Sequence, residues 1–305
     1  PVRWASVAAD LLADYLEDAS DPADVIPPVL EEHAALARLA VRAASERRPD
    51  IVSLIEAARA RHVSHLLDEA KLTLGAGKGG QSWALDALPA TDTVPWASLH
   101  SIPTAAITGS NGKTTTVRLV AACARAHGWC DGFNCTDGVF IDRKVVASGD
   151  YSGPAGTRLV LRNTSVEAAV IETARGGILR RGLAADHADV AIVTNISPDH
   201  FGEYGIDDLD GLADVKLSIA HLLDREGLLV LNAADALLRA KSDVLRQRLG
   251  WQPMLGWFAR QYDHPALVQH RGRLGTTSGV RAGHLWLSSG SREHDLGAII
   301  DMPLT

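Results

Sequence analysis

The feature that most limits the fold of this chain is the stretch 108–116, which reads Thr-Gly-Ser-Asn-Gly-Lys-Thr-Thr-Thr. The apolar run 105–107 before it predicts a strand, and apolar residues recur at helical spacing over 117–121 after it. A strand, a glycine turn and a helix N-terminus direct several backbone N–H groups at one point, which makes an anion site. We therefore expect Lys113 to lie along the β- and γ-phosphates of a nucleotide and the Thr114 hydroxyl to bind Mg²⁺.

This stretch departs from the general phosphate-loop pattern at one position. The pattern Gly-x-x-x-x-Gly-Lys-[Ser/Thr] requires a glycine at position 107, where this chain has Ile107. The motif alone is therefore weak support for a nucleotide site, and further support must come from other parts of the sequence.

The chain changes character at about residue 104, where strands begin to alternate with helices. The pattern predicts strands over 105–108, 133–136, 139–141, 168–172, 190–194 and 228–231, and helices over 113–127, 207–223 and 234–249. Continuous apolar strands between helices predict an α/β fold, a mostly parallel sheet with helices on both faces. Polar residues end four of these strands, at 108, 172, 194–195 and 232, and ligands of such sheets bind at that edge.

The segments on either side of this α/β region have other patterns. Residues 1–103 predict a helical N-terminal region and a linker, and 104–305 predict one nucleotide-binding domain. Within that domain, residues 252–305 predict a small β appendage, because a hairpin pattern spans 280–287.

Composition narrows the classes of partner. The net charge of −7 argues against a nucleic-acid partner, which needs a basic face. No run approaches eighteen apolar residues, so we expect no membrane-spanning helix and no membrane partner. Cys123, Cys130 and Cys135 lack the paired spacing of a zinc site and predict free thiols, and hence a cytoplasmic protein.

Three further residues are candidates for the chemistry. Glu172 ends an apolar strand and precedes a glycine turn, so we expect it to bind the metal near Thr114. His200 lies in a loop at the same sheet edge and is a second candidate metal ligand. Lys216 lies on the apolar face of a predicted helix. Either it extends to the surface, or partial burial lowers its pKa so that the amine reacts with CO₂ to form a carbamate.

Several runs in order resemble the ATP-binding central domain of the Mur ligases. The resemblance extends to the Mur-ligase-like module of the cyanophycin synthetases and covers about residues 104–305. The segments that carry it are 108–115, 136–138, 149–154, 172–183, 195–200, Lys216, 231–235 and 301–305.

The resemblance implies an ATP-dependent carbon–nitrogen ligase that needs ATP and Mg²⁺. Such an enzyme activates a carboxylate as an acyl phosphate, which the amine of an amino acid or dipeptide attacks. It implies nucleotide binding by Gly109, Asn111, Gly112, Lys113, Thr114, Thr115, Asn195, Asn232 and Asp235. It implies metal binding by Thr114, Glu172 and His200, catalytic roles for Lys113, His200 and a carbamylated Lys216, and acceptor binding by Thr136, Asp137 and Arg175.

Two departures from the resemblance leave alternatives open. Residues 1–103 are too few and too helical to be the ATP-grasp module that cyanophycin synthetases carry, and we expect the C-terminal Mur ligase domain to be missing after Thr305. A poly-γ-glutamate or cell-wall type of Mur ligase, and a nucleotide-binding pseudo-ligase subunit, therefore stay open. The expected partner is a small-molecule or peptide substrate, and a homo-oligomer is left open.

Overall fold

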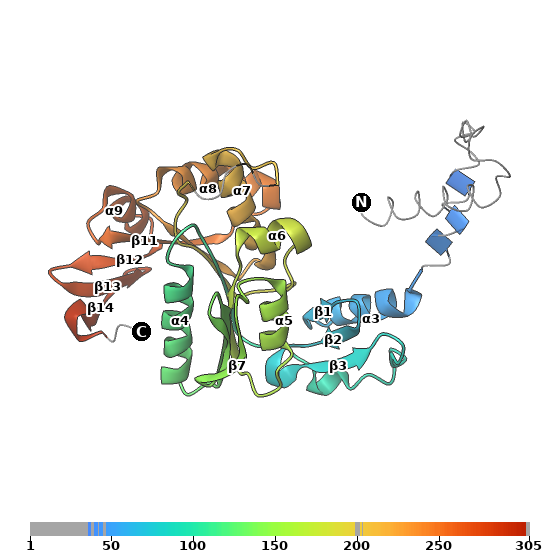
Figure 1. Cartoon of the computed structure of the whole chain (residues 1–305). Coiled ribbons are helices and arrows are strands. Elements are labelled where there is room, and N and C mark those ends of the chain that lie inside the picture. The colour runs from blue at the N-terminus through green and yellow to red at the C-terminus, as the bar shows by residue number, and fades with distance from the viewer. Residues whose placement is uncertain are drawn as a thin grey trace. The chain divides into compact units, whose positions relative to one another are not determined.

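The computed structural model describes residues 36–37, 40–41, 43–44, 47–198, 202 and 204–302 (Figure 1). The predicted metal ligand His200 lies outside these residues. The chain divides into two compact units, Pro1–Val52 and Ser53–Thr305. In the first unit, the described residues before 47 are helical, and helix α3, Pro49–Arg59, begins there.

A small antiparallel sheet opens the second unit. Its strands are β1 (His65–Leu67), β2 (Lys71–Leu74) and β3 (Gln81–Ala84), in that order, with the short helices η1 (Gly77–Gly79) and η2 (Trp96–Ser98) beside them. Their core holds the buried side chains Leu54, Ala58, Val63, Leu72, Leu74, Val94 and Leu99. The region 1–103, predicted as helical with a linker, thus also contains three strands. Strands of three or four residues are too short to show a period of two in the sequence.

The main sheet has eleven strands in the order β14-β13-β12-β11-β10-β9-β4-β8-β5-β6-β7. Its first half in the sequence is β4 (Thr104–Thr108), β5 (Asp131–Cys135), β6 (Gly138–Ile141), β7 (Lys144–Ser148) and β8 (Ala168–Glu172). Its second half is β9 (Val190–Val193), β10 (Leu228–Asn232), β11 (Met254–Gln261), β12 (Thr276–Arg281), β13 (His284–Ser289) and β14 (Arg292–Ala298). The strands from β12 to β5 in this order are parallel, and hairpins close both ends.

The helices of this unit follow the strands. They are α4 (Lys113–Ala126), α5 (Pro154–Leu161), α6 (Arg175–Arg181), α7 (Leu209–Leu217), α8 (Ala236–Leu249) and α9 (Pro265–Arg271), with η3 (Ser218–Leu222) and η4 (Ile299–Asp301). The predicted α/β fold with a mostly parallel sheet is confirmed. Among the described residues, no helix combines the length and the apolar character needed to cross a membrane.

Alternate residues of the central strands fill the cores on the two faces of the sheet. In β4, Ala105 and Ile107 pack in the same cluster as Val117 of α4, whereas Ala106 packs in the cluster that contains Val160 of α5. This alternation follows from the two-residue period of a strand. A strand covered on both faces needs apolar residues at every position, which is why β4 and β8 read as continuous apolar runs.

The predicted β appendage over 252–305 proves to be a continuation of the main sheet. Strand β11 pairs in parallel with β10, and β12 pairs in parallel with β11 before β13 and β14 turn back. The sequence marks the hairpin but not the pairing partner of β11, because pairing between distant strands is decided by packing.

Candidate phosphate and acceptor site

The stretch 108–116 forms a turn between β4 and α4, as predicted. Gly112 takes the N-cap position of α4 in the left-handed conformation, with φ of 79°. Gly109 has a φ of 145°, and a Cβ there would lie 1.8 Å from Thr194 Oγ1. The first-turn amides of α4 have no preceding helical carbonyl to bind, so they and the positive end of the helix favour an anion.

Side chains from the neighbouring strand end hold this phosphate loop in place. Asn195 accepts a hydrogen bond from the Asn111 amide at 3.1 Å and donates to the Asn111 carbonyl at 3.0 Å. Thr194 Oγ1 also donates to the Asn111 carbonyl, at 2.6 Å. Lys113 Nζ donates to the Ser110 carbonyl at 3.1 Å. Asn195, predicted to bind the nucleotide, thus contacts the loop itself.

Glu172 lies at the end of β8 beside the first turn of α4. Its carboxylate is fully buried and accepts a hydrogen bond from Thr114 Oγ1 at 2.9 Å. Burial raises the pKa of the Glu172 carboxyl, and the Thr114 hydroxyl and the charge of Lys113 offset part of that effect. Its second oxygen, Oε1, is buried and has no hydrogen-bond partner among the described residues.

This arrangement fits a divalent cation. An unpartnered buried carboxylate oxygen is costly, and a hard cation with oxygen ligands would satisfy it. In the described part of the chain, no group of three or more His, Cys, Asp or Glu side chains is placed to hold a metal. Among the described residues, Glu172 and the hydroxyl of Thr114 are the oxygen ligands beside the loop, and Mg²⁺ sites of this kind are completed by substrate phosphates.

Lys216 of α7 reaches the same loop from another side. Its side chain is 1% exposed, and Nζ donates a hydrogen bond to the Gly109 carbonyl at 2.9 Å. The surface position considered from the sequence is therefore wrong. The carbamate stays a prediction.

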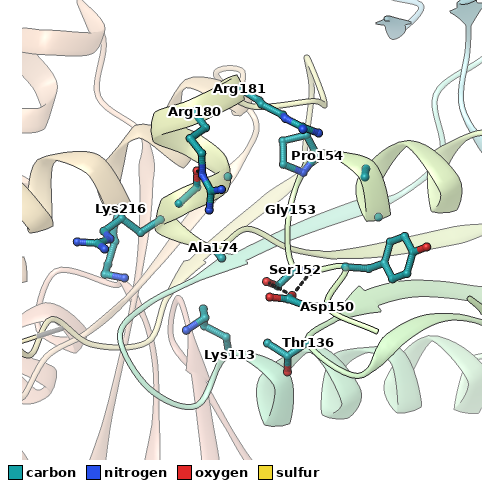
Figure 2. Close-up of a pocket in the computed structure, with 16 residues that line it drawn as sticks. Lys113, Thr136, Asp150, Ser152, Gly153, Pro154, Ala174, Arg180, Arg181 and Lys216 are labelled. Carbon is teal, nitrogen blue, oxygen red and sulfur yellow. Dashed lines mark hydrogen bonds between the residues drawn. The ribbon is translucent and has the colours of Figure 1, made fainter. Parts of the chain in front are cut away.

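A cavity of about 520 Å³ opens beside Lys113. Five cationic side chains and one carboxylate line it among the described residues, namely Lys113, Arg175, Arg180, Arg181, Lys216 and Asp150. In Figure 2, Lys113 and Asp150 lie on one side of the cavity, and Arg180 extends toward it from the other. This charge pattern favours an anionic ligand next to the phosphate loop.

Close backbone packing forms the wall of this cavity. A Cβ at Gly177 would lie 2.9 Å from Pro154 Cδ, so a glycine there lets α6 approach the loop before α5. Asp150 Oδ1 in that loop accepts hydrogen bonds from the Ser152 amide at 3.0 Å and the Ser152 hydroxyl at 2.6 Å. The Nε of Arg180 donates a hydrogen bond to the Gly176 carbonyl at 3.1 Å.

The predicted acceptor residues lie in different places. Thr136 lines the cavity, and its hydroxyl is 3.2 Å from that of Thr114. Arg175 lines the cavity and is 6% exposed. Asp137 does not line it and pairs with Arg118 at 2.6 Å.

The predicted adenine and ribose residues have structural contacts. Asn232 Nδ2 donates to the Thr194 carbonyl at 3.0 Å. Asp235 Oδ1 accepts from the Leu237 amide at 3.0 Å at the start of α8, and its Oδ2 accepts from the Ile196 amide at 2.7 Å. These contacts order the loops at the sheet edge, and nucleotide binding by Asn232 and Asp235 stays a prediction.

Sequence reasoning assigned no role to several cavity residues. These are Asp150, Tyr151, Ser152, Gly153, Pro154, Gly176, Gly177, Arg180 and Arg181. A signal was present, because all of them fall in the runs 149–154 and 172–183 that carry the family resemblance.

The family model of the Mur ligase middle domain matches residues 107–249. Residues 107–249 are therefore similar to a Mur ligase middle domain. The match begins at the last apolar residues of β4 and ends with α8, so it includes the phosphate loop, Glu172 and Lys216. The resemblance to Mur ligases drawn from the sequence is confirmed.

The chain is also similar to cyanophycin synthetases. That of Synechocystis sp. is 39% identical over 206 residues, which are 67% of this chain and 23% of that protein. That of Crocosphaera subtropica is 36% identical over 220 residues, which are 72% of this chain and 24% of that protein. The chain thus spans about a quarter of the length of the curated relatives it matches. A solved UDP-N-acetylmuramoyl-L-alanyl-D-glutamate–2,6-diaminopimelate ligase shares 18% identity at a TM-score of 0.47, covering 64% of this chain and 39% of that chain.

Proposed function

We propose that this chain is the nucleotide-binding part of an ATP-dependent carbon–nitrogen ligase. In this proposal it activates a carboxylate as an acyl phosphate, which the amine of an amino acid or dipeptide then attacks. The observation that carries the proposal is the cationic cavity beside Lys113 of the phosphate loop. An anionic acceptor in that cavity would lie next to the γ-phosphate of a nucleotide held by the loop.

The named relatives support the same reaction class. The relatives are named cyanophycin synthetases and UDP-N-acetylmuramoylalanine–D-glutamate ligases, and the second name states a ligation to D-glutamate. The similarity to the first group is higher, at 39% against 34% identity over a longer alignment. An amide ligase of the cyanophycin-synthetase type is therefore the first choice over a cell-wall type.

The proposed reaction has two balanced steps. An acceptor carboxylate oxygen attacks the γ-phosphorus, the bond to the bridging oxygen of ADP breaks, and ADP leaves. The amine nitrogen then attacks the acyl carbon, the carbon–oxygen bond to phosphate breaks, phosphate leaves, and the amine proton passes to water. Lys113 would face the charge that develops on the transferred phosphoryl group, and Arg175 would hold the acceptor carboxylate.

The remaining predicted groups complete the proposal. Thr114 and Glu172 would hold Mg²⁺, which when bound neutralises charge on the β- and γ-phosphates. His200 would hold a second metal ion. Carbamylation of Lys216 would place an anionic group at the same edge of the phosphate loop.

The test is a hydroxylamine trap on the full chain with Mg²⁺-ATP. Hydroxylamine converts an acyl phosphate to a hydroxamate without the natural amine, so the assay needs only the first step. Acceptors would be β-aspartyl-arginine, cyanophycin primers and single amino acids. We expect ADP and hydroxamate in equal amounts with one acceptor class and no product in Lys113→Ala, because that variant loses the cation facing the phosphates.

The matched control is Lys144→Ala, which removes an exposed lysine on β7, far in sequence from the loop. It should retain the activity of the unmodified chain. Normal hydroxamate formation by Lys113→Ala would contradict the proposed phosphate site. ATP binding without ADP formation across the whole panel would instead favour the pseudo-ligase alternative.

A further inference from the structure

Lys216 lies on the short helix α7, which has one buried face and one polar face. Helix α7 has nine residues, and its buried positions are Leu212, Ala213, Lys216 and Leu217. A helix of this length is marginal without tertiary contacts. The placement of Nζ against the Gly109 carbonyl, at 2.9 Å, therefore depends on what fixes α7 as a whole.

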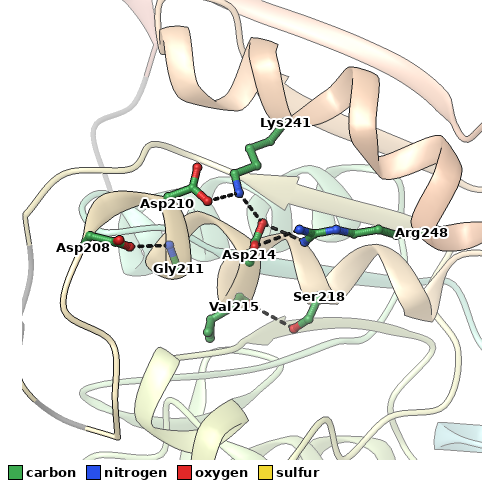
Figure 3. A network of polar contacts seen from close by, with 8 residues as sticks. All are labelled: Asp208, Asp210, Gly211, Asp214, Val215, Ser218, Lys241 and Arg248. Carbon is green, nitrogen blue, oxygen red and sulfur yellow. Dashed lines mark hydrogen bonds and ion pairs between the residues drawn. The ribbon is translucent and has the colours of Figure 1, made fainter.

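The polar face of α7 carries two carboxylates one turn apart. Asp210 and Asp214 are separated by four residues, a spacing at which like charges on a helix repel each other. Lys241 of α8 reaches both of them, at 2.6 Å and 2.7 Å from Nζ (Figure 3). Its side chain is only 11% exposed, whereas the side chains of Asp210 and Asp214 are 66% and 30% exposed. Water therefore competes less for the contact with Asp214 than for the contact with Asp210.

A second cation contacts the same helix from a more exposed position. Arg248 binds Asp214 through both terminal nitrogens, at 2.7 Å and 2.9 Å, and its side chain is 47% exposed. It does not reach Asp210 by hydrogen bond or ion pair among the contacts of the described residues. In the described part of the chain, Lys241 alone bridges the two carboxylates, whereas Arg248 pairs with Asp214 from a more exposed position.

The base of α8 is itself tied to the sheet edge. Asp235 caps the start of α8 and accepts a hydrogen bond from the Ile196 amide in the loop after β9. Helix α8 is therefore held at its start, and Lys241 and Arg248 are its ionic contacts with α7 among the described residues. Figure 3 shows Lys241 and Arg248 reaching from α8 toward the carboxylates of α7.

We propose that Lys241 is a positioning residue that holds α7 so that the Lys216 amine stays buried against the phosphate loop. The consequence for catalysis rests on the proposed function, but the positioning itself does not. Removing Lys241 leaves two carboxylates without their shared cation and frees α7 to shift or open. The Lys216 amine then becomes accessible, while Lys113, on α4, keeps its surroundings.

The experiment is competitive labelling of lysine amines with acetic anhydride, read by mass spectrometry in buffer freed of CO₂. Exposed Lys144 serves as the internal reference. In Lys241→Met, which keeps much of the stem and removes the charge, we expect Lys216 labelling to rise about fivefold or more. Labelling of Lys113 should stay within about twofold, because only α7 is released.

Three variants distinguish a release of α7 from a general loss of stability. Arg248→Gln removes an exposed partner of the same carboxylate and should leave Lys216 labelling within about twofold. Lys241→Arg keeps a cation in reach of both carboxylates and should restore slow labelling. Asp210→Asn removes one of the two contacts and should give an intermediate rate, which keeps the test usable if Lys241→Met does not fold.

Two results would overturn the proposal. One is unchanged Lys216 labelling in both Lys241→Met and Asp210→Asn. The other is an equal rise in Arg248→Gln, which would show that any loss of surface charge loosens α7. The readout needs no turnover, so a chain without ligase activity would still give a clear answer. Where activity is found, Lys241→Met should lower kcat more than Arg248→Gln does.

Discussion

Glu172→Gln should make the ligand-free protein more stable while it weakens Mg²⁺-dependent nucleotide binding. The Glu172 carboxylate is fully buried, and one of its oxygens has no hydrogen-bond partner among the described residues. Glutamine has the same size, and its carbonyl can still accept the hydrogen bond from Thr114. The amide nitrogen takes the unpartnered position, but desolvating a neutral amide costs less than desolvating a charged oxygen.

The expected gain in the free energy of unfolding follows from the cost of burying a polar group without a hydrogen-bond partner. That cost is about 1–3 kcal/mol, so relief of part of it should raise the free energy of unfolding by about 1–2 kcal/mol. In a domain of this size, such a gain raises the midpoint of thermal unfolding by about 2–8 °C. Calorimetry on the ligand-free protein, in buffer with a chelator, measures it.

The gain in stability from Glu172→Gln should increase as the pH rises. Burial raises the pKa of Glu172 above its ordinary value of 4.5, so the folded state favours the protonated carboxyl. Below pH 4.5 this carboxyl is protonated in both the folded and the unfolded chain, and the raised pKa carries no penalty. As the pH rises through the folded-state pKa, the penalty appears. The stability difference between Glu172→Gln and the parent protein should therefore widen toward neutral pH.

Asp131→Asn is the comparison for the ion pair. Asp131 is also fully buried and also has one oxygen, Oδ1, without a hydrogen-bond partner among the described residues, but its Oδ2 pairs with Arg125 at 2.6 Å. The variant should lose about 1–3 kcal/mol, since it deprives a cation of its partner. Mg²⁺-ATP at a hundredfold excess over its Kd should stabilise the parent protein by about 2.7 kcal/mol, and the Mg²⁺-dependent part should vanish in Glu172→Gln. A less stable Glu172→Gln at neutral pH, or an undiminished Mg²⁺ effect, would refute this reasoning.

Two further predictions concern backbone and charge. Gly109→Ala should cost about 3 kcal/mol or more in chemical denaturation, because its Cβ would meet Thr194 and its backbone is open to glycine alone. Gly112→Ala has open space around the new methyl group and should cost only about 1 kcal/mol for the left-handed conformation; equal losses would contradict both estimates. Burial acts to raise the pKa of Asp68, but hydrogen bonds from Arg162 and two backbone amides together lower it to about 2. The advantage of the parent protein over Asp68→Asn should be full above pH 4 and should shrink as the pH falls from 3.8 toward 2, measured by urea unfolding.

The sequence was sufficient to predict the contact between Thr114 and Glu172, which are 58 positions apart. The carboxyl ends of parallel strands meet at one edge, and a phosphate loop begins at that edge, so a polar residue ending a neighbouring strand must lie close to it. The same rule placed Asn195 beside the loop. Predictions of this kind need only the strand order of the centre of the sheet.

The walls of the cavity could not be predicted in the same way. Whether Arg180 faces the ligand depends on how closely α6 approaches the loop at Pro154, and that distance is set by glycines at 153 and 177. A second glycine-rich segment, Gly-Ala-Gly-Lys-Gly-Gly at 75–80, has glycines at positions where the backbone packs closely. A Cβ at Gly75 would lie 2.0 Å from the Gly79 carbonyl oxygen, so glycine there serves close packing of the backbone.

The strand pairing beyond β10 also could not be predicted from the sequence. The pattern over 280–287 marked a hairpin, but only the parallel pairing of β11 with β10 shows that the hairpin extends the main sheet. Likewise, Asp235 is close to the predicted nucleotide site, yet its two oxygens bind backbone amides of separate segments. Polar residues near a site have several local partners to choose from, and the sequence does not rank them.

The charges of the site are unbalanced in a way that a nucleotide and an acceptor would correct. Glu172 has a buried oxygen without a partner, and the cavity beyond Lys113 has cations in excess of carboxylates among the described residues. The unpartnered carboxylate oxygen costs stability because it is buried, and the excess positive charge of the cavity favours an anionic ligand. A divalent cation would satisfy the first and an anionic acceptor the second. Each ligand should therefore raise the free energy of unfolding by itself. The rise produced by both ligands together should be larger in the parent protein than in Glu172→Gln.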